Sequence, residues 1–309
     1  MPERRCVRTR RVCAGRPSRF DGSPVAAPSS RGESVDALFS KRFRFPNCVG
    51  RKVLVLGLGG GSDIIMACAV ARLLPASGPT RGIIYANTKR EREPHLGRVA
   101  SLVYRVAPEE SDPYAGAMLE DAHGTTRIDH CVPRGDEGCP WIFVLERKDE
   151  QTRAQLAEDI RALGFDLLIG VDIGGDSLVK DATSGPQGRD QQMLAVLRST
   201  GLPMLHVVVA PCSDGESFAD QMETALRERL EDGRFLGSFS LEPVLPLLRD
   251  LSERALLEEN RTPRIILAAA ESKLEDAGDD RVVVPRDREP IVPRRWLLHG
   301  FVFGEPAAD

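Results

Sequence analysis

Two glycine-rich segments that contain aspartate are the strongest chemical signals in this sequence. The first is GLGGGSD at 57–63, which joins an apolar run to a helical pattern. Glycines let the backbone approach a ligand closely, and the amides at the start of the following helix attract an anion, so we expect phosphate to bind here. A tight turn that serves only helix–strand packing is the alternative. The candidate binding residues are Gly57, Gly59, Gly60, Gly61, Ser62 and Asp63.

The same segment departs from a dinucleotide-binding fingerprint. That fingerprint requires glycine at its sixth position, which is Ser62 here, and the next predicted strand is followed by Asn87 and Thr88 rather than by a ribose-binding acid. We expect Asn87 and Thr88 to border the bound group. Lys89 and Arg90 come next and would suit the 2′-phosphate of NADP, so this cofactor is kept as an alternative.

The second segment is VDIGGDS at 171–177, which also follows an apolar run. Asp172 is expected at the tip of a strand, and Gly174 and Gly175 allow the chain to curl so that Asp176 returns toward it. Two neighbouring carboxylates suit Mg²⁺ or a pair of substrate hydroxyls. The alternative is that both aspartates only cap turns or helix starts.

Two further segments carry charged residues near predicted helix starts. In GPQGRD at 185–190, Arg189 is suited to clamp a phosphate or carboxylate, whereas Asp190 complements the helix start. In PCSDGE at 211–216, Cys212 has no base close to it in sequence, which disfavours a nucleophilic role. Asp214 is a further candidate binding residue, with capping of the next helix as its alternative role.

A regular alternation of apolar strands and amphipathic helices positions these segments. Strands are predicted at 52–57, 82–86, 141–145, 166–172 and 203–210. Helices are predicted over 63–74, 151–163, 188–199 and 218–230, and the less regular remainder suggests helices over 243–258 and 262–276 and strands at 281–284 and 296–303. The pattern predicts an α/β fold with a Rossmann-like, doubly wound, mostly parallel sheet and helices on both faces. Ligands bind such sheets beyond the carboxyl ends of the strands.

Composition narrows the class of protein. The chain has 309 residues and a formal net charge of −4, from 42 Lys and Arg against 46 Asp and Glu, so we expect no nucleic acid partner. No apolar run approaches the ~18 residues of a membrane-spanning helix, so we expect no membrane partner either. The sequence leaves the oligomeric state open.

The N-terminal region differs in composition from the rest of the chain. Residues 1–20 contain seven Arg and a single acid, and a stretch rich in Gly, Ser, Pro and Ala follows. We interpret 1–45 as a disordered arm, 46–304 as one α/β domain and 305–309 as a tail. An Arg-rich arm also suits an organelle transit peptide, so we expect a cytoplasmic protein, or an organellar one if the arm is a targeting signal.

The cysteines are seven in number and scattered, which indicates free thiols in a reducing compartment. One local cluster suggests zinc, although its spacing lacks the close pairs of familiar zinc motifs: His123, His130, Cys131 and Cys139.

Three segments together resemble the signature segments of domain-of-unknown-function family 1152. They are GLGGGSDIIMA at 57–67, VDIGGDSL at 171–178 and GRDQQML at 188–194, and the likeness covers most of 46–304. The third segment departs from the serine–proline-containing stretch of the family, because it is glycine-rich and contains Arg189. The resemblance implies a Rossmann-like fold and a shared site around Asp172, Asp176 and the segment 57–63, which we call the glycine loop. It implies no particular reaction.

The residues favour an enzyme that acts on a phosphorylated small metabolite or a nucleotide. In this hypothesis the amides of Gly59 to Ser62 hold phosphate, Asp172 and Asp176 hold Mg²⁺ or ribose-like hydroxyls, and Arg189 offsets developing charge. An NADP-dependent oxidoreductase is one alternative, and a non-catalytic sensor of nucleotides or metabolites is another.

Overall fold

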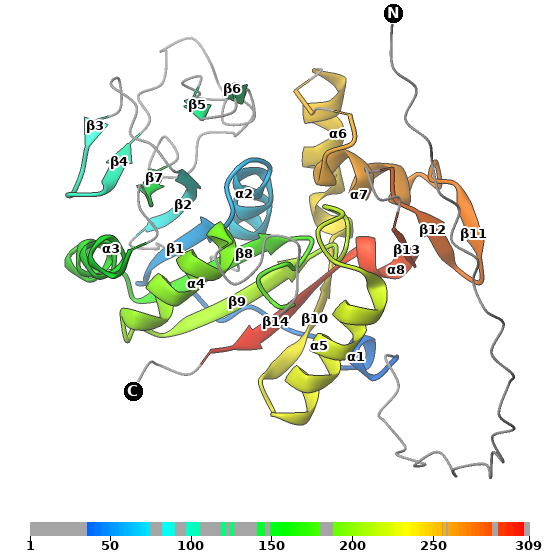
Figure 1. Cartoon of the computed structure of the whole chain (residues 1–309), viewed down its shortest axis with the longest axis horizontal. Coiled ribbons are helices and arrows are strands. Elements are labelled where there is room, and N and C mark those ends of the chain that lie inside the picture. Colours follow the sequence, from blue (N-terminus) through cyan, green and yellow to red (C-terminus); the bar gives the residue numbers. More distant parts are fainter. Residues whose placement is uncertain are drawn as a thin grey trace, which may run out of the picture. The chain divides into compact units, whose positions relative to one another are not determined.

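The central element of the fold is a mixed β-sheet (Figure 1). The computed structural model describes residues 36–74, 82–89, 97–105, 119–121, 124–126, 141–145, 149–179, 188–254, 256–257, 259–285 and 290–305. Within these residues the sheet has nine strands in the order β10-β14-β9-β8-β1-β2-β7-β4-β3. Their bounds are β1 Lys52–Gly57, β2 Gly82–Lys89, β3 Gly97–Arg98, β4 Val103–Arg105, β7 Trp141–Val144, β8 Leu167–Ile173, β9 Met204–Val209, β10 Phe235–Ser240 and β14 His299–Gly304.

The five strands in the middle of the sheet, from β9 to β7, are all parallel. Antiparallel pairs lie only toward the edges, where β14 pairs with both β9 and β10, and β4 pairs with β7 and β3. The middle strands are buried along almost their whole length, as expected for a sheet that is covered on both faces.

Helices cover both faces of the sheet, and the side chains of β1 show how. Val53 and Val55 belong to a core shared with α2, α5, α6 and α7, whereas Leu54 and Leu56 belong to a second core shared with α3 and α4. Successive side chains of a strand point to opposite faces, so each face has its own core. The helices are α1 Asp36–Ser40, α2 Asp63–Leu73, α3 Glu150–Ala162, α4 Arg189–Ser199, α5 Ala219–Glu231, α6 Leu245–Glu253, α7 Thr262–Ala270 and α8 Arg294–Leu297, with a 3₁₀ turn at Glu242–Val244.

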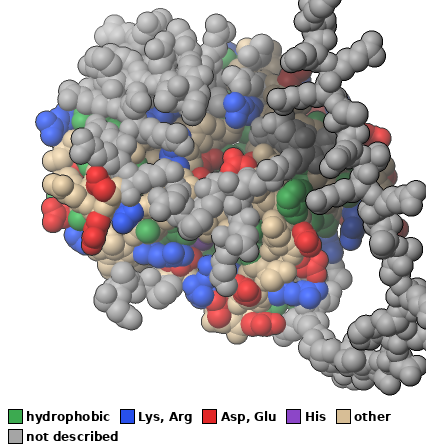
Figure 2. All heavy atoms as spheres, viewed as in Figure 1, with side chains coloured by type: hydrophobic (Ala, Val, Ile, Leu, Met, Phe, Trp, Pro, Cys, Tyr) green, Lys and Arg blue, Asp and Glu red, His purple; other side chains and the backbone are tan. Residues whose placement is uncertain are grey.

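Two small sheets complete the described elements: β11 Asp276–Gly278, β12 Arg281–Val283 and β13 Ile291–Pro293 in one, and β5 Leu119–Asp121 with β6 Gly124–Thr126 in the other. None of the described helices is long and apolar enough to cross a bilayer. Basic and acidic side chains are interspersed over the described part of the face shown in Figure 2.

The predicted fold class is confirmed, because the chain forms a mostly parallel sheet with helices on both faces. Several local predictions need correction. The run 296–303 was expected to be one strand, but it is the end of α8 followed by β14. The helix expected over 262–276 ends at Ala270, and β10 was not predicted at all.

The boundaries of the folded part also differ from those expected. All described residues belong to one compact unit, residues 33–309. Residues 36–45, which we assigned to the arm, contain α1 and pair with β10 through Phe43 N and Ser238 O at 2.7 Å. Glu305, which we assigned to a tail, forms an ion pair with Arg198 at 2.7 Å. The remainder of the proposed arm lies outside the described residues.

The chain order of the strands changes direction at the centre of the sheet. From β1 the chain continues to β2 on one side, whereas β8 pairs with the other side of β1. Helices after strands on opposite sides of such a point leave a crevice at the carboxyl ends of the strands, where ligands bind in doubly wound folds. The glycine loop follows β1 and Asp172 lies near the end of β8, so both lie at this crevice.

Candidate functional site

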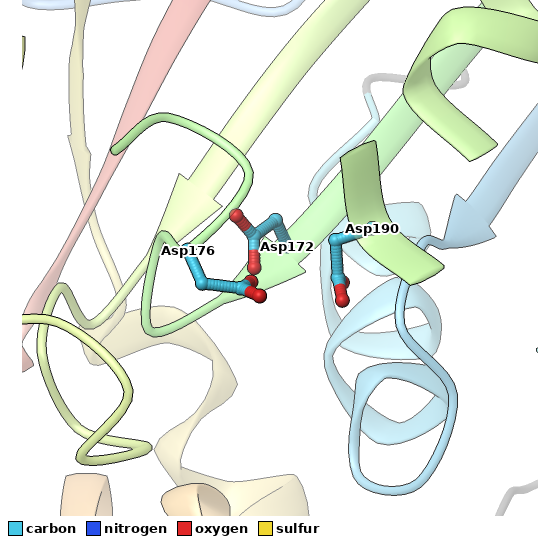
Figure 3. Close-up of side chains that lie close together, drawn as sticks. All are labelled: Asp172, Asp176 and Asp190. Atoms are coloured by element: carbon cyan, nitrogen blue, oxygen red, sulfur yellow. The ribbon is translucent and has the colours of Figure 1, made fainter. Parts of the chain in front are cut away.

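Three aspartates from different elements converge at the crevice. Asp172 comes from the end of β8, Asp176 from the loop that follows, and Asp190 from the first turn of α4. Each offers a carboxylate oxygen, and these oxygens all lie within 4.8 Å of one another. Figure 3 shows the three carboxyl groups around a common space. Oxygen ligands at this spacing fit a hard divalent cation such as Mg²⁺.

Asp176 and Asp190 line a pocket of about 150 Å³ that the glycine loop also borders. Its lining is dominated by acidic side chains and by the backbone of the loop, and comprises Gly59, Gly60, Gly61, Ser62, Asp63, Ile173, Asp176, Asp190, Asp214, Glu216, Arg261 and Thr262. The structure thus brings together most of the residues that the sequence singled out after β1 and β8.

The buried carboxyl groups raise one another's pKa values. Burial, and then the charge of Asp176, raises the pKa of Asp172 to about 8. Burial also raises the pKa of Asp63, Asp190 and Asp214 well above the ordinary value, and neighbouring aspartates add to each shift. Ionising this cluster therefore requires a compensating positive charge. A bound cation supplies that charge directly.

The two carboxylate oxygens of Asp172 differ in their hydrogen bonding. Its Oδ2 accepts hydrogen bonds from the backbone N–H of Ser177 at 3.1 Å and from the Ser177 hydroxyl. Its Oδ1 is buried and has no hydrogen-bond partner within the described part of the chain. A buried polar atom without a partner is costly, so Oδ1 is suited to accept a ligand.

The glycine loop uses one of its amides internally. Gly59 N donates to Asp63 Oδ2 at 2.6 Å. The expectation that this amide binds phosphate therefore needs correction. Gly60 and Gly61 have φ values of 89° and 58°, and their amides donate to no acceptor among the described residues. An anion that binds the loop would therefore use Gly60 and Gly61 at the start of α2.

Close packing explains why several of these positions are glycine. A Cβ on Gly59 would overlap the Asp190 carboxylate, and one on Gly60 would overlap the Arg189 guanidinium and lie 2.7 Å from Thr88 O. The Arg189 guanidinium thus lies against the glycine loop. This is the position that we expect for a residue that offsets the charge of a bound phosphate. The functional roles that we expect for these residues stay predictions.

Other predicted residues support the loops without lining the pocket. Thr88 Oγ1 donates to Gly57 O at 2.8 Å, and a Cβ on Gly57 would lie 3.0 Å from Asn87 Oδ1. Gly174 and Gly175 have φ values of 90° and 91°, and a Cβ on either would overlap a side chain, that of Asp214 or of Met222. These contacts fit structural roles.

The structure bears on two residues that follow β9, Asp214 and Cys212. Asp214 does not cap α5, which begins at Ala219. Instead its Oδ1 accepts from Glu216 N at 3.0 Å within a turn, and the residue lines the pocket. Cys212 is buried, and burial raises the pKa of its thiol, so it stays protonated and is unsuited to nucleophilic attack.

Comparison with known proteins gives one family. Residues 139–271 match the family model described as "Protein of unknown function (DUF1152)". This confirms the resemblance seen in the sequence motifs, and the matched segment contains two of the three motifs as well as Asp172, Asp176 and Asp190. The glycine loop precedes the matched segment. No curated protein and no solved structure matches the chain significantly.

Sequence reasoning missed Ser177, His206 and Glu305. His206 is buried in β9, its Nε2 lies 2.8 Å from Ser177 Oγ, and its Nδ1 lies 3.3 Å from Glu305 Oε1. A histidine within the otherwise apolar strand MLHVVV was the available signal. Asp190 was interpreted only as a helix-start residue, and its place in the carboxylate cluster was also missed.

The structure describes one of the two residues proposed to meet NADP and none of the four proposed for zinc. Lys89, proposed to meet the 2′-phosphate of NADP, is buried at the end of β2 with 3% of its surface exposed. Its proposed partner Arg90 and the four residues of the zinc hypothesis (His123, His130, Cys131 and Cys139) lie outside the described residues.

Proposed function

We propose that this protein is an enzyme that acts on a phosphorylated small metabolite or a nucleotide with the help of a divalent cation. The observation that carries the proposal is the convergence of Asp172, Asp176 and Asp190 beside a glycine loop at the centre of the sheet. A cation held by these aspartates would neutralise their carboxylates, and the amides of the glycine loop would bind the ligand's phosphate.

The positive features of the pocket support an anionic ligand despite its many carboxylates. The helices α2 and α4 both begin here, and the partial positive charge of a helix N-terminus favours phosphate. Gly60 and Gly61 offer amides, and Arg189 lies against Gly60. These groups would offset the negative charge of a bound anion.

Each side chain then has a defined task. Asp172, Asp176 and Asp190 would hold the cation, which would supply positive charge beside the phosphate group. The amides of Gly60 and Gly61 orient the phosphate, and Arg189 adds a fixed positive charge. Asp63 keeps the loop in shape through its bond to Gly59.

Calorimetric titration with Mg²⁺ or Mn²⁺ tests the cation site, followed by a panel of nucleotides, sugar phosphates and NADP with and without the cation. We expect cation binding that Asp176→Asn abolishes. The exposed acid Asp220 provides the matched control, and Asp220→Asn should bind as the wild type does. Absence of cation binding by the wild type contradicts the proposal.

The same panel separates the alternatives. Turnover of a phosphorylated compound that depends on the cation supports the enzyme. Hydride transfer from NADPH would instead identify an oxidoreductase, and tight binding of one ligand without turnover would identify a sensor.

A further inference from the structure

A chain of polar contacts leads from Asp172 away from the pocket and across the sheet. The Ser177 hydroxyl bonds to Asp172 Oδ2 and lies 2.8 Å from His206 Nε2. On the other side of the ring, His206 Nδ1 lies 3.3 Å from Glu305 Oε1. The second carboxylate oxygen of Glu305 accepts from Arg198, at 2.9 Å from Nε and 2.7 Å from Nη2.

These groups come from four separate parts of the fold. Ser177 follows β8, His206 lies in the middle of β9, Glu305 comes directly after β14, and Arg198 lies in the last turn of α4. Asp172 and His206 are fully buried, Ser177 is 8% exposed, and the side chain of Glu305 is inaccessible. Buried polar groups persist where they are bonded to one another, and this network links the cation site to the edge of the parallel strands.

The protons that each group carries set the direction of the hydrogen bonds along the chain. Burial raises the pKa of Glu305, but His206 and Arg198 lower it to about 2, so Glu305 is ionised. Burial lowers the pKa of His206, so the ring is neutral near pH 7. The single proton of the Ser177 hydroxyl goes to Asp172 Oδ2, so the Ser177 oxygen accepts from His206 Nε2–H, and Nδ1 lies 3.3 Å from the Glu305 carboxylate.

We propose that Ser177, His206 and Glu305 are positioning residues that hold the Asp172 carboxylate in one orientation at the cation site. The inference rests on the proposed function, because it assigns Asp172 to a cation. With Oδ2 held by the backbone and side chain of Ser177, the carboxylate can rotate little, and Oδ1 is presented to the site. Partners that hydrogen-bond to a metal ligand in this way typically affect metal affinity by about 10- to 100-fold.

The order of serine, histidine and glutamate also occurs in hydrolases with a nucleophilic serine. Here the Ser177 hydroxyl donates to Asp172, its oxygen lies against His206, and Ser177 is not among the residues that line the pocket. A nucleophile must reach the substrate, so the contacts favour positioning over attack.

The test is Mn²⁺ affinity, measured by calorimetry on the full chain and its variants. We expect Ser177→Ala to bind Mn²⁺ about 10- to 100-fold more weakly than the wild type. Ser177→Thr keeps the hydroxyl and should restore most of the affinity, which a loss of packing alone would not explain. Ser238 is a buried serine on β10, and Ser238→Ala is the matched control that should bind normally.

A second variant guards against misfolding of the first. Glu305→Gln keeps the shape of the side chain but removes the charge that lies beside His206 Nδ1, so Mn²⁺ affinity should fall while the chain still melts cooperatively. If the wild type binds no Mn²⁺, the proposed function fails and the positioning role with it. If Asp172→Asn loses binding but Ser177→Ala and Glu305→Gln bind as the wild type, only the positioning role fails. Covalent labelling of Ser177 by a fluorophosphonate would show a nucleophile and would also overturn it.

Discussion

At the scale of the residue, Asp172 couples the stability of the protein to pH. Its pKa is about 8 in the folded chain against 3.8 as its ordinary value, so the folded state binds more protons between these values. The free energy of unfolding should therefore fall as pH rises from about 4 to about 8, by up to about 1.4 kcal/mol per pH unit for this group. The shifts of Asp63, Asp190 and Asp214 have the same sign. Urea denaturation in a pH series measures this trend, and stability that rises over the range would contradict it.

Replacing Asp172 by Asn removes the buried charge but keeps an oxygen for Ser177. Asn binds no proton, so Asp172→Asn should lack this pH dependence, and its stability relative to the wild type should rise between about pH 4 and about pH 8 and level off above pH 8. Cation binding should be abolished. If the side chain only capped a turn, the variant would instead lose on the order of 1 kcal/mol and bind ligands normally. Denaturation and calorimetry on the same samples distinguish the two outcomes.

Residue types and their positions after predicted strands were enough to predict much of the site. They did not predict the polar contacts that connect Asp172 to Ser177, His206 and Glu305. Asp172 and Asp176 were predicted because they follow an apolar strand, and the structure brings them together. Asp190 and His206 have ordinary structural explanations, as a helix-start acid and as a strand residue. Their contacts depend on how α4 and β9 pack beside β8, which a single sequence does not reveal.

At the scale of the element, the glycine loop can be tested with a matched pair of glycines. Gly61 and Gly164 both have left-handed backbones, with φ values of 58° and 68°, and a Cβ on either meets no atom within 4 Å. Replacement by Ala should cost each variant about 1 kcal/mol of stability. Only Gly61 lines the pocket, so only Gly61→Ala should weaken binding of the phosphorylated ligand. Equal ligand affinity in the two variants, measured by calorimetry, would argue against phosphate at this loop.

Elements with a clear hydrophobic period were predicted well, and those at the edges were not. The strand predicted at 52–57 matches β1, because it is a buried central strand followed by glycine. The run FLGSFS of β10 mixes glycine and serine with apolar residues and gives a weak strand signal. The run 296–303 is apolar except at His299 and Gly300, so periodicity could not place the change from α8 to β14.

At the scale of the whole molecule, the boundary of the folded unit can be tested by two deletions. Residues 1–33 are rich in Arg, Ser and Pro and contain too little apolar surface to add to a core, so their deletion should leave the melting temperature and cation affinity nearly unchanged. Deletion of 1–45 also removes Leu38, which is 1% exposed, and Phe39, Phe43 and Phe45, which pack against the main core.

Burial of each such side chain contributes about 1.5–3 kcal/mol, so the longer deletion should cost several kcal/mol. It also removes the backbone pairing of Phe43 with Ser238 and so uncovers part of the edge strand β10. We therefore expect a large fall in melting temperature, or aggregation, for the longer deletion alone. Calorimetric melting of the two shortened chains beside the full chain decides the matter. Similar melting temperatures for both would place the boundary of the folded unit after residue 45, whereas a large loss in the shorter deletion would show that residues before 34 belong to it.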